Sequence, residues 1–439
     1  MHPQPSIRQA TFWYGFVPLL LTFALAQVSL QVDIIMLAQR HPGMSGAYAL
    51  FTRLVLIDLV WIMAVGSVAS VLISQAQRQA QSAQCIRWVL AWAAGIGVIL
   101  MLAGALIYPL LARWLTSGQA YWHTLLAQAL PWFIAGAPFR LINACAAFAL
   151  HATGQGQLAI RWKLSEVAAK IGLNWLFLDT FEFGFSACFV SSLIVQLASS
   201  LWVLTVLRRQ TGGWPAWPPK PWRREQSRKA RWEAQRVLAM QLLGLATIGL
   251  FTWPALSPIS LNRLDALGAG LALAALLFAP LAAFTRLLTL RFSSCQPAQI
   301  NGLINELRCL GLPVFILIAG LLALSRTELG QHIYQQHGPW WSWFVISLAL
   351  SLPVRLLSAL YRAALQSQSH FQPVTKADTV LNWGLGIPLL LIGLRLDCPL
   401  LAFAYLWLPE ICIAAWLHRL YLINTQSTER AAHVTETSQ

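Results

Sequence analysis

Eight charged side chains fall inside long apolar segments of this sequence. An ionised group is costly in such a segment unless it is paired or reaches water, so charges of this kind often mark ion pathways and substrate sites. The chemistry open to them is ion pairing, exchange of a proton or cation at a carboxylate, and recognition of an anion by a guanidinium group. The eight residues are Asp33, Arg53, Asp58, Arg140, Glu166, Lys170, Arg286 and Arg355.

Two of the arginines belong to a repeated pattern. Arg140 in Pro-Phe-Arg-Leu and Arg355 in Pro-Val-Arg-Leu each open a long apolar segment, and Leu-Asn-Trp follows about one helix later, ending at Trp175 and Trp383. The second pair of motifs lies seven residues closer together than the first, so the repeat is approximate. Duplicated halves are typical of secondary transporters, which move one half against the other around a central site.

The equivalent positions of Arg140 and Arg355 predict that both face a cleft between the halves, where they would bind carboxylate or phosphate. The alternative is that both extend toward lipid headgroups. Arg53 is a third candidate for the cleft, although it could pair with Asp58, five residues later on the chain. The seventh apolar segment has no acidic residue at the place that corresponds to Asp33. We therefore expect a neutral to basic cavity and an amphipathic small-molecule substrate, with an anionic metabolite or siderophore as a suitable form.

The composition requires these segments to lie in a membrane. The chain has 439 residues, of which 57% are hydrophobic and only 10% charged, whereas soluble domains carry about 25% charged residues. Since a membrane-spanning helix needs roughly 20 apolar residues, we predict an all-α polytopic membrane protein with about twelve transmembrane helices in two pseudo-symmetric six-helix bundles. The predicted parts are an N-terminal lobe (1–207), a basic Pro/Trp-rich cytoplasmic linker (208–236), a C-terminal lobe (237–422) and a disordered cytoplasmic tail (423–439).

The charge distribution predicts the orientation. The formal net charge is +15, and nine of the thirty Lys and Arg residues lie between Arg208 and Arg236. Basic loops stay in the cytoplasm, so we expect an inner-membrane protein with both termini and the linker on that side. Prolines favour an extended backbone, and basic residues with tryptophans suit a strap on anionic lipids. A docking site for a partner is the alternative; no nucleic-acid module is recognisable.

The first apolar segment carries a specific motif. Pro18, Ala26-Gln27 and Val32-Asp33-Ile34-Ile35-Met36 follow one another in it. This order resembles the first helix of the multidrug and toxin extrusion (MATE) transporters of the multidrug/oligosaccharidyl-lipid/polysaccharide (MOP) flippase superfamily, with Ile34 in place of the usual threonine. The resemblance implies a six-plus-six fold and alternating access, with Asp33 in a proton- or sodium-coupling site of the N-terminal lobe.

The fifth segment departs from the family pattern. The family often has two asparagines, or an asparagine and an aspartate, four residues apart and facing the first-helix aspartate. Asn174 matches the second position, but Lys170 stands at the first. Glu166, Lys170 and Asn174 would share one helix face. Lys170 could neutralise Asp33 permanently as a tethered cation, or pair with Glu166 and leave Asp33 free, or this end of the helix could be solvated.

The sequence predicts a transporter and not an enzyme. His151 and His370 have no acidic cluster or nucleophile motif beside them, and no glycine-rich phosphate loop is present. None of the seven cysteines forms a CxxC pair, so we expect no metal, disulfide or cofactor chemistry. The expected function is secondary active export of an amphipathic small molecule, coupled to a proton or sodium gradient. The alternatives are a flippase for a lipid-linked phosphate-bearing precursor and a non-transporting membrane scaffold of a biosynthetic complex.

Overall fold

The computed structural model describes residues 13, 15–40, 48, 51, 55–115, 120–252, 261–334 and 336–437. Secondary structure over these residues is helical, with no strand among them. Nine of the described helices are long and apolar enough to cross a membrane, and one bent pair makes a tenth. The expected class, an all-α polytopic membrane protein, is confirmed. The count of twelve is not established, because the described apolar stretch of the first helix is only Phe16–Leu25 and the fifth helix is too polar to pass the same test.

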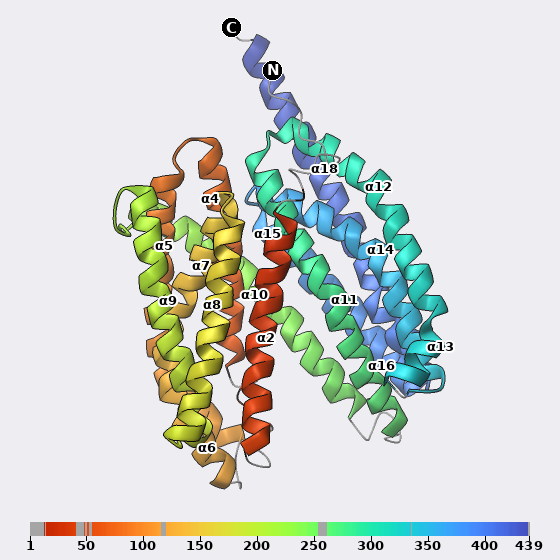
Figure 1. Cartoon of the computed structure of the whole chain (residues 1–439). Coiled ribbons are helices and arrows are strands. Elements are labelled where there is room, and N and C mark those ends of the chain that lie inside the picture. The colour runs from red at the N-terminus through yellow and green to blue at the C-terminus, as the bar shows by residue number, and fades with distance from the viewer. Residues whose placement is uncertain are drawn as a thin grey trace. The chain divides into compact units, whose positions relative to one another are not determined.

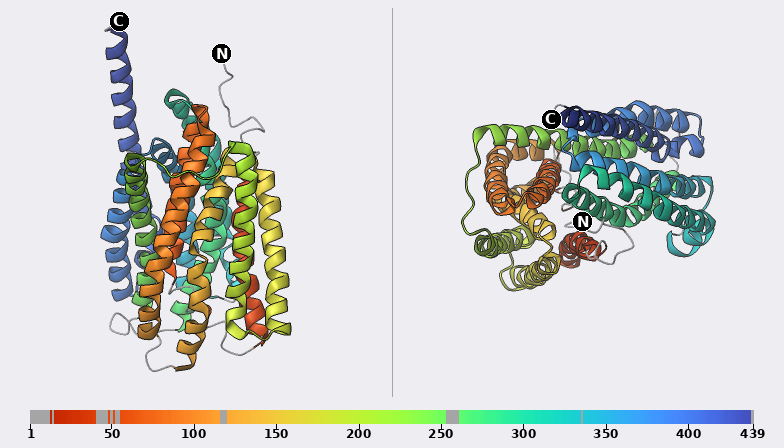
Figure 2. Two further views of the ribbon diagram at one scale, coloured as in Figure 1. Left: turned by 90° about the vertical axis from the view of Figure 1, so that its left-hand side faces the viewer. Right: turned by 90° about the horizontal axis from the view of Figure 1, so that it is seen from above.

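The first compact unit comprises Gly15–Ala234. Seen from above, its helices run nearly end-on to the viewer, as expected for a bundle of membrane spans (Figure 2). A short π-helix, Leu176–Thr180, continues α8, and a 3-10 turn, Gly184–Ser186, precedes α9. The helices are α2 (Phe16–Arg40), α4 (Leu56–Arg78), α5 (Ser82–Leu115), α6 (Ala120–Ala135), α7 (Ala137–Ala152), α8 (Gly156–Trp175) and α9 (Ala187–Thr211), as labelled in Figure 1.

The second compact unit comprises Gln235–Gln439 together with Met1–Tyr14, and Trp13 stacks on Phe284 within it at a ring distance of 6.0 Å. Its shorter elements are α13 (Arg326–Glu328), π-helices Leu329–Tyr334 and Asn382–Gly386, and the 3-10 turn Ala404–Leu406. Its other helices are α10 (Lys220–Phe251, whose part from Gln235 onward belongs to this unit), α11 (Leu261–Ser294), α12 (Pro297–Leu324), α14 (Pro339–Ser367), α15 (Phe371–Leu381), α16 (Ile387–Arg395), α17 (Pro399–Phe403) and α18 (Leu408–Thr437).

Close helix contacts fix the segments that carry the two repeated arginines. In the first unit α6 and α7 bend by 51° around Gly136, and a Cβ added at Gly97 of α5 would lie 2.4 Å from Pro138 Cα of α7. In the second unit a Cβ at Gly270 of α11 would lie 2.5 Å from the Phe344 ring of α14. Glycines allow this approach, which is common between membrane helices. Arg140 on α7 and Arg355 on α14 therefore lie on helices that pack tightly against a neighbour, and each helix belongs to the fourth span of its half.

The middle segment and the tail differ from expectation. The extended strap predicted for 208–236 is confined to 212–219, because α9 runs to Thr211 and α10 begins at Lys220. Helix α18 continues to Thr437, so the tail expected to be disordered from residue 423 is helical. The middle segment contains the helix-favouring residues Ala, Glu, Lys and Arg, and the tail contains Ala, Glu and Arg, which outweigh the polarity on which the expectation rested.

Candidate functional site

Asp33 of α2 is the centre of a buried polar cluster in the first unit. Its side chain is 2% exposed. The Oδ2 atom accepts hydrogen bonds from Lys170 Nζ and Tyr48 Oη, each at 2.7 Å, and Oδ1 accepts one from Asn174 Nδ2 at 2.8 Å. Both carboxylate oxygens are therefore engaged by donors. The structure thus brings Asp33, Lys170 and Asn174 together, which are the three residues expected at the ion-coupling site.

The two residues of α8 that bind Asp33 lie on one face of that helix. Lys170 and Asn174 are four residues apart, so their side chains follow one another along the helix. Lys170 Nζ also lies 3.2 Å from Ser29 Oγ, one turn before Asp33 on α2. Asn174 Oδ1 accepts a hydrogen bond from Ser191 of α9. The cluster therefore ties α8 to α2 and to α9, and α2 and α8 run side by side in Figure 1.

The neighbouring glutamate does not compete for the lysine. Glu166 Oε2 binds Lys163 Nζ at 2.6 Å, so Lys170 keeps Asp33 as its acidic partner. Of the open alternatives for Lys170, the geometry is that of a pair with Asp33. Just beyond Asn174, α8 passes into the π-helix that begins at Leu176. Such π segments are frequent at functional sites because they interrupt the regular backbone hydrogen bonding.

Arg140 is held by an ion pair within the same unit. Its Nε atom donates to Asp58 Oδ2 at 2.9 Å, and Nη2 contacts the same oxygen. Its Nη1 atom donates to the Phe133 carbonyl oxygen at 2.8 Å, and the guanidinium lies 3.8 Å from the centre of the Phe133 ring. Asp58 is thus the partner of Arg140. Arg53, the third cleft candidate, lies outside the described residues.

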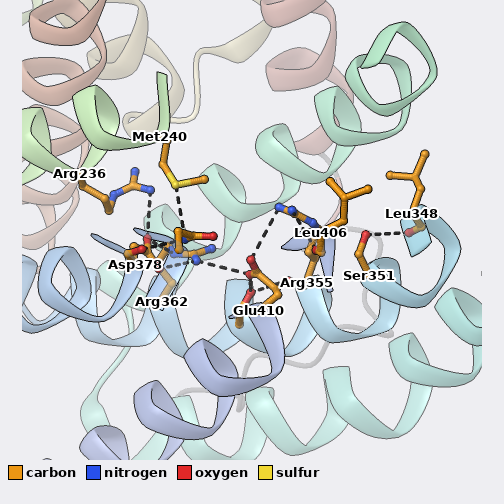
Figure 3. Close-up of polar contacts among 11 residues, drawn as sticks. Arg236, Met240, Leu348, Ser351, Arg355, Arg362, Asp378, Leu406 and Glu410 are labelled. Atoms are coloured by element: carbon orange, nitrogen blue, oxygen red, sulfur yellow. Dashed lines mark hydrogen bonds and ion pairs between the residues drawn. The ribbon is translucent and has the colours of Figure 1, made fainter. Parts of the chain in front are cut away.

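The second unit contains a larger charged cluster, shown in Figure 3. Asp378 of α15 accepts two hydrogen bonds from Arg362 of α14, with Nη2 at 2.9 Å and Nε at 3.1 Å. Arg236 of α10 reaches the same carboxylate at 3.4 Å. Glu410 of α18 lies 3.6 Å from Arg362 and 3.8 Å from Arg355. Three arginines thus surround two buried carboxylates, so the cluster carries a formal charge of +1.

Arg355 keeps hydrogen-bonding capacity that Arg140 does not. Its guanidinium lies 4.2 Å from the centre of the Phe278 ring, and Nη2 donates to the Leu406 carbonyl oxygen at a long 3.4 Å. Its Nε atom is buried and has no hydrogen-bond partner in the part of the chain that the structure describes. Glu410 is also engaged by Ser358. Arg355 is therefore the arginine better able to bind an additional anionic group.

Sequence reasoning missed Arg362, Asp378 and Glu410. A signal for Asp378 was present in the repeat, because it precedes Asn382 by four residues just as Lys170 precedes Asn174. The place at which we expected no acid in the second half, near Thr252, borders residues outside the described ranges, and Asn382 Nδ2 lies 3.5 Å from Met240 Sδ. The expectation of a neutral to basic cavity did not take account of Asp378 and Glu410, which other helices contribute.

Comparisons with known proteins rest on structure. No family model matches the sequence, and no curated protein matches it either. A MATE crystal structure in the bent conformation superposes with a TM-score of 0.83 at 11% identity, covering 98% of this chain and 100% of that one. A Vibrio cholerae MATE transporter gives a TM-score of 0.79 at 14% identity, with 95% and 96% covered.

A further neighbour is a MOP superfamily transporter from Pyrococcus furiosus, described as having a binding pocket of reverse polarity that suggests a different function. It superposes with a TM-score of 0.80 at 11% identity over 95% of this chain and 96% of that one. At such low identities the likeness concerns the fold. The chain has the fold of MATE transporters of the MOP superfamily over nearly its whole length, which agrees with the resemblance carried by the first-helix motif.

Proposed function

We propose that this protein is a secondary active exporter of an amphipathic small molecule, working by alternating access in the inner membrane with both termini cytoplasmic. The observation that carries the proposal is the buried carboxylate of Asp33, bound between α2 and α8 on a MATE-like fold. A buried charge at bilayer depth is expensive, and its usual reason is ion movement or conformational coupling.

The coupling ion that suits this arrangement is a proton. Lys170, Tyr48 and Asn174 all present donors to Asp33, whereas sodium, like other hard cations, is held by a shell of oxygen atoms. Uptake of a proton by Asp33 would remove the carboxylate charge and break the salt bridge between α2 and α8. Release of the proton would restore it. The pair would thus convert a proton gradient into movement of α8 against α2.

Arg355 would provide the preference for an anionic group on the substrate. Within the described ranges, its buried Nε atom has no hydrogen-bond partner, and its acidic neighbour Glu410 lies 3.8 Å away. A guanidinium binds a carboxylate or phosphate through two parallel hydrogen bonds, which lysine cannot reproduce. Arg140, which is already bound by Asp58 and a carbonyl oxygen, would serve the cleft mainly by shaping it.

The test is transport by purified protein in liposomes loaded with a fluorescent amphipathic carboxylate, with an amphipathic cation of similar size as the comparison probe. We expect carboxylate efflux that follows an imposed pH gradient and ignores a sodium gradient. Arg355→Lys should slow carboxylate efflux, and Arg355→Ala should slow it further. Efflux driven by sodium alone would refute proton coupling. Equal efflux of both probes by all three proteins would refute the role of Arg355.

A further inference from the structure

The first half of α10 has a basic face that the transport proposal does not use. Its four cations recur at spacings of four and three residues, which places them within an arc of about 80° around the helix. All four are exposed. They line a groove of about 570 Å³. The lining residues are Lys220, Pro221, Arg224, Glu225, Arg228 and Arg231.

The positive charge of this groove is not cancelled locally. Glu225, its one acidic residue, is bound by Lys229 Nζ at 2.7 Å on the same helix. Lys220, Arg224 and Arg228 show no ion pair within the described part of the chain, nor does Arg231. The groove therefore offers four cations to an external anion.

The opposite face of the helix is fixed on α5. Gln226 and Ala230 are 3% and 0% exposed. The Trp222 ring packs edge-on against Trp92 at 6.0 Å, and Trp92 Nε1 donates to Ser227 Oγ at 3.1 Å. These contacts hold α10 in one rotation, so its basic face points consistently away from α5.

The contacts between α10 and α5 also indicate at which level of the membrane the groove lies. Helix α5 provides a candidate membrane span, Ser82–Arg113, and Trp92 lies about three turns from its first residue, in the third of the span nearest that end. The segment of α10 beside Trp92 is therefore level with one end of that span, where lipid headgroups lie. Trp214 and Trp217, just before α10, are 52% and 59% exposed. Exposed tryptophans are typical of the membrane interface.

We propose that Lys220, Arg224, Arg228 and Arg231 form a binding site for the phosphate groups of anionic phospholipids. The inference joins three observations: four uncompensated cations on one helix face, a groove large enough for headgroups, and a position level with the end of a membrane span. Each cation near an anionic surface contributes attraction worth about a fivefold change in binding. The lipid would bind the helix that leads into the second unit.

The experiment uses the full-length protein in micelles containing equal amounts of phosphatidylglycerol and phosphatidylcholine, with bound lipids counted by native mass spectrometry. We expect wild type to retain phosphatidylglycerol preferentially. Arg224→Gln/Arg228→Gln should reduce that preference about 25-fold, and adding Lys220→Gln and Arg231→Gln should abolish it. The matched control removes four exposed cations elsewhere, at Arg113, Arg308, Arg395 and Arg419.

The control variant should keep the preference of wild type. An equal loss in the control and in the groove variant would show that net charge alone attracts the lipid, and would overturn the site. Unchanged retention in the double variant would overturn it too. Millimolar glycerol phosphate is added as a soluble competitor. Displacement of the lipid by this compound would show a site for free phosphate and would overturn the assignment to lipid.

Discussion

The two halves of the chain place a buried ion pair between their first and fifth spans, but with the charges exchanged. In the first half the acid is Asp33 on α2 and the base is Lys170 on α8. In the second half the base is Arg236 on α10 and the acid is Asp378 on α15. Both halves therefore have an ion pair between these two spans, but the acid lies on the first span in one half and on the fifth span in the other.

The sequence separations match for the fifth-span residues, but the charge on the first span is displaced by about one helical turn, because Asp33 and Lys170 are 137 residues apart and Arg236 and Asp378 are 142 residues apart. Lys170 with Ser29, and Asn174 with Asp33, are each 141 residues apart. Arg236 with Asp378, and Asn382 with Met240, are each 142 residues apart. The fifth spans also change to a π-helix at equivalent points, just after Asn174 and at Asn382.

This difference implies that the acid and the base of a buried ion pair must be substituted together. A buried charge without its partner costs several kcal/mol, so reversing one residue alone would be strongly destabilising. The second half contains a larger cluster, because Arg362 also contacts Asp378 and Glu410 contacts Arg362. Its acid, Asp378, is shared by two arginines, whereas Asp33 has the single cationic partner Lys170. We therefore keep the proposed ion coupling in the first half and propose a structural lock in the second.

The largest loss of stability should follow from removing the charge of Asp378, which holds the second-half cluster together. Asp378→Asn leaves Arg236 and Arg362 without their shared carboxylate, and we expect a stability loss of about 3–5 kcal/mol. Thermal unfolding in detergent measures it. Asp397→Asn is the control, because Asp397 is 71% exposed where it meets Arg263. A melting temperature equal to that of the control would contradict the assigned lock.

A second prediction exchanges the charges of the first half. Asp33→Lys and Lys170→Asp should each destabilise the protein by about 3 kcal/mol, since each places two like charges together in a buried site. The double variant restores opposite charges and should recover more than half of the summed loss. Additive losses in a double-mutant cycle would mean that Asp33 and Lys170 do not interact energetically.

A third prediction separates the repeated arginines. Arg140→Gln strands the buried Asp58 and should cost about 3 kcal/mol of stability. Arg355→Gln should cost less, about 1 kcal/mol, because Glu410 retains Arg362 and Ser358 as partners. Unfolding of both variants in the same detergent gives the comparison. A greater loss for Arg355→Gln would reverse the roles proposed for the two residues.

The smallest effect concerns the support behind Asn174. Ser191→Ala removes the donor to Asn174 Oδ1 and should cost about 1 kcal/mol. Transport should fall only slightly, because Asn174 keeps its contact with Asp33. Ser192→Ala is the matched change, because the Ser192 hydroxyl donates to the Cys188 carbonyl oxygen at 2.6 Å. Equal stability of the two variants would show that the Asn174 contact adds nothing.

The sequence predicted the fold class because membrane spans follow from composition and segment length alone. It also predicted the grouping of Asp33, Lys170 and Asn174, since helical spacing placed the last two on one face and the first-helix motif supplied the third. It did not predict the cluster around Asp378. Asp378 and Glu410 lie on different helices, α15 and α18, and only packing shows that they share Arg362.

Local helix propensity explains why the linker is less extended than we expected. Prolines between 212 and 221 suggested an extended linker, but Pro221 stands in the first turn of α10, where its missing N–H group costs nothing. The register of the basic face follows from contacts of Trp222 and Ser227 with α5. Those contacts depend on tertiary structure and could not be derived from charge counts.

The most direct test of the central claim, that the Asp33–Lys170 pair couples transport to protons, uses the double variant Asp33→Asn/Lys170→Gln in proteoliposomes. Because it removes both charges, no buried ion is left unpaired and the protein should fold with nearly the stability of wild type. We predict that an imposed pH gradient no longer drives efflux of the fluorescent carboxylate, while slow exchange down its own concentration gradient persists. Proton-driven efflux at the wild-type rate from this folded double variant would contradict the account.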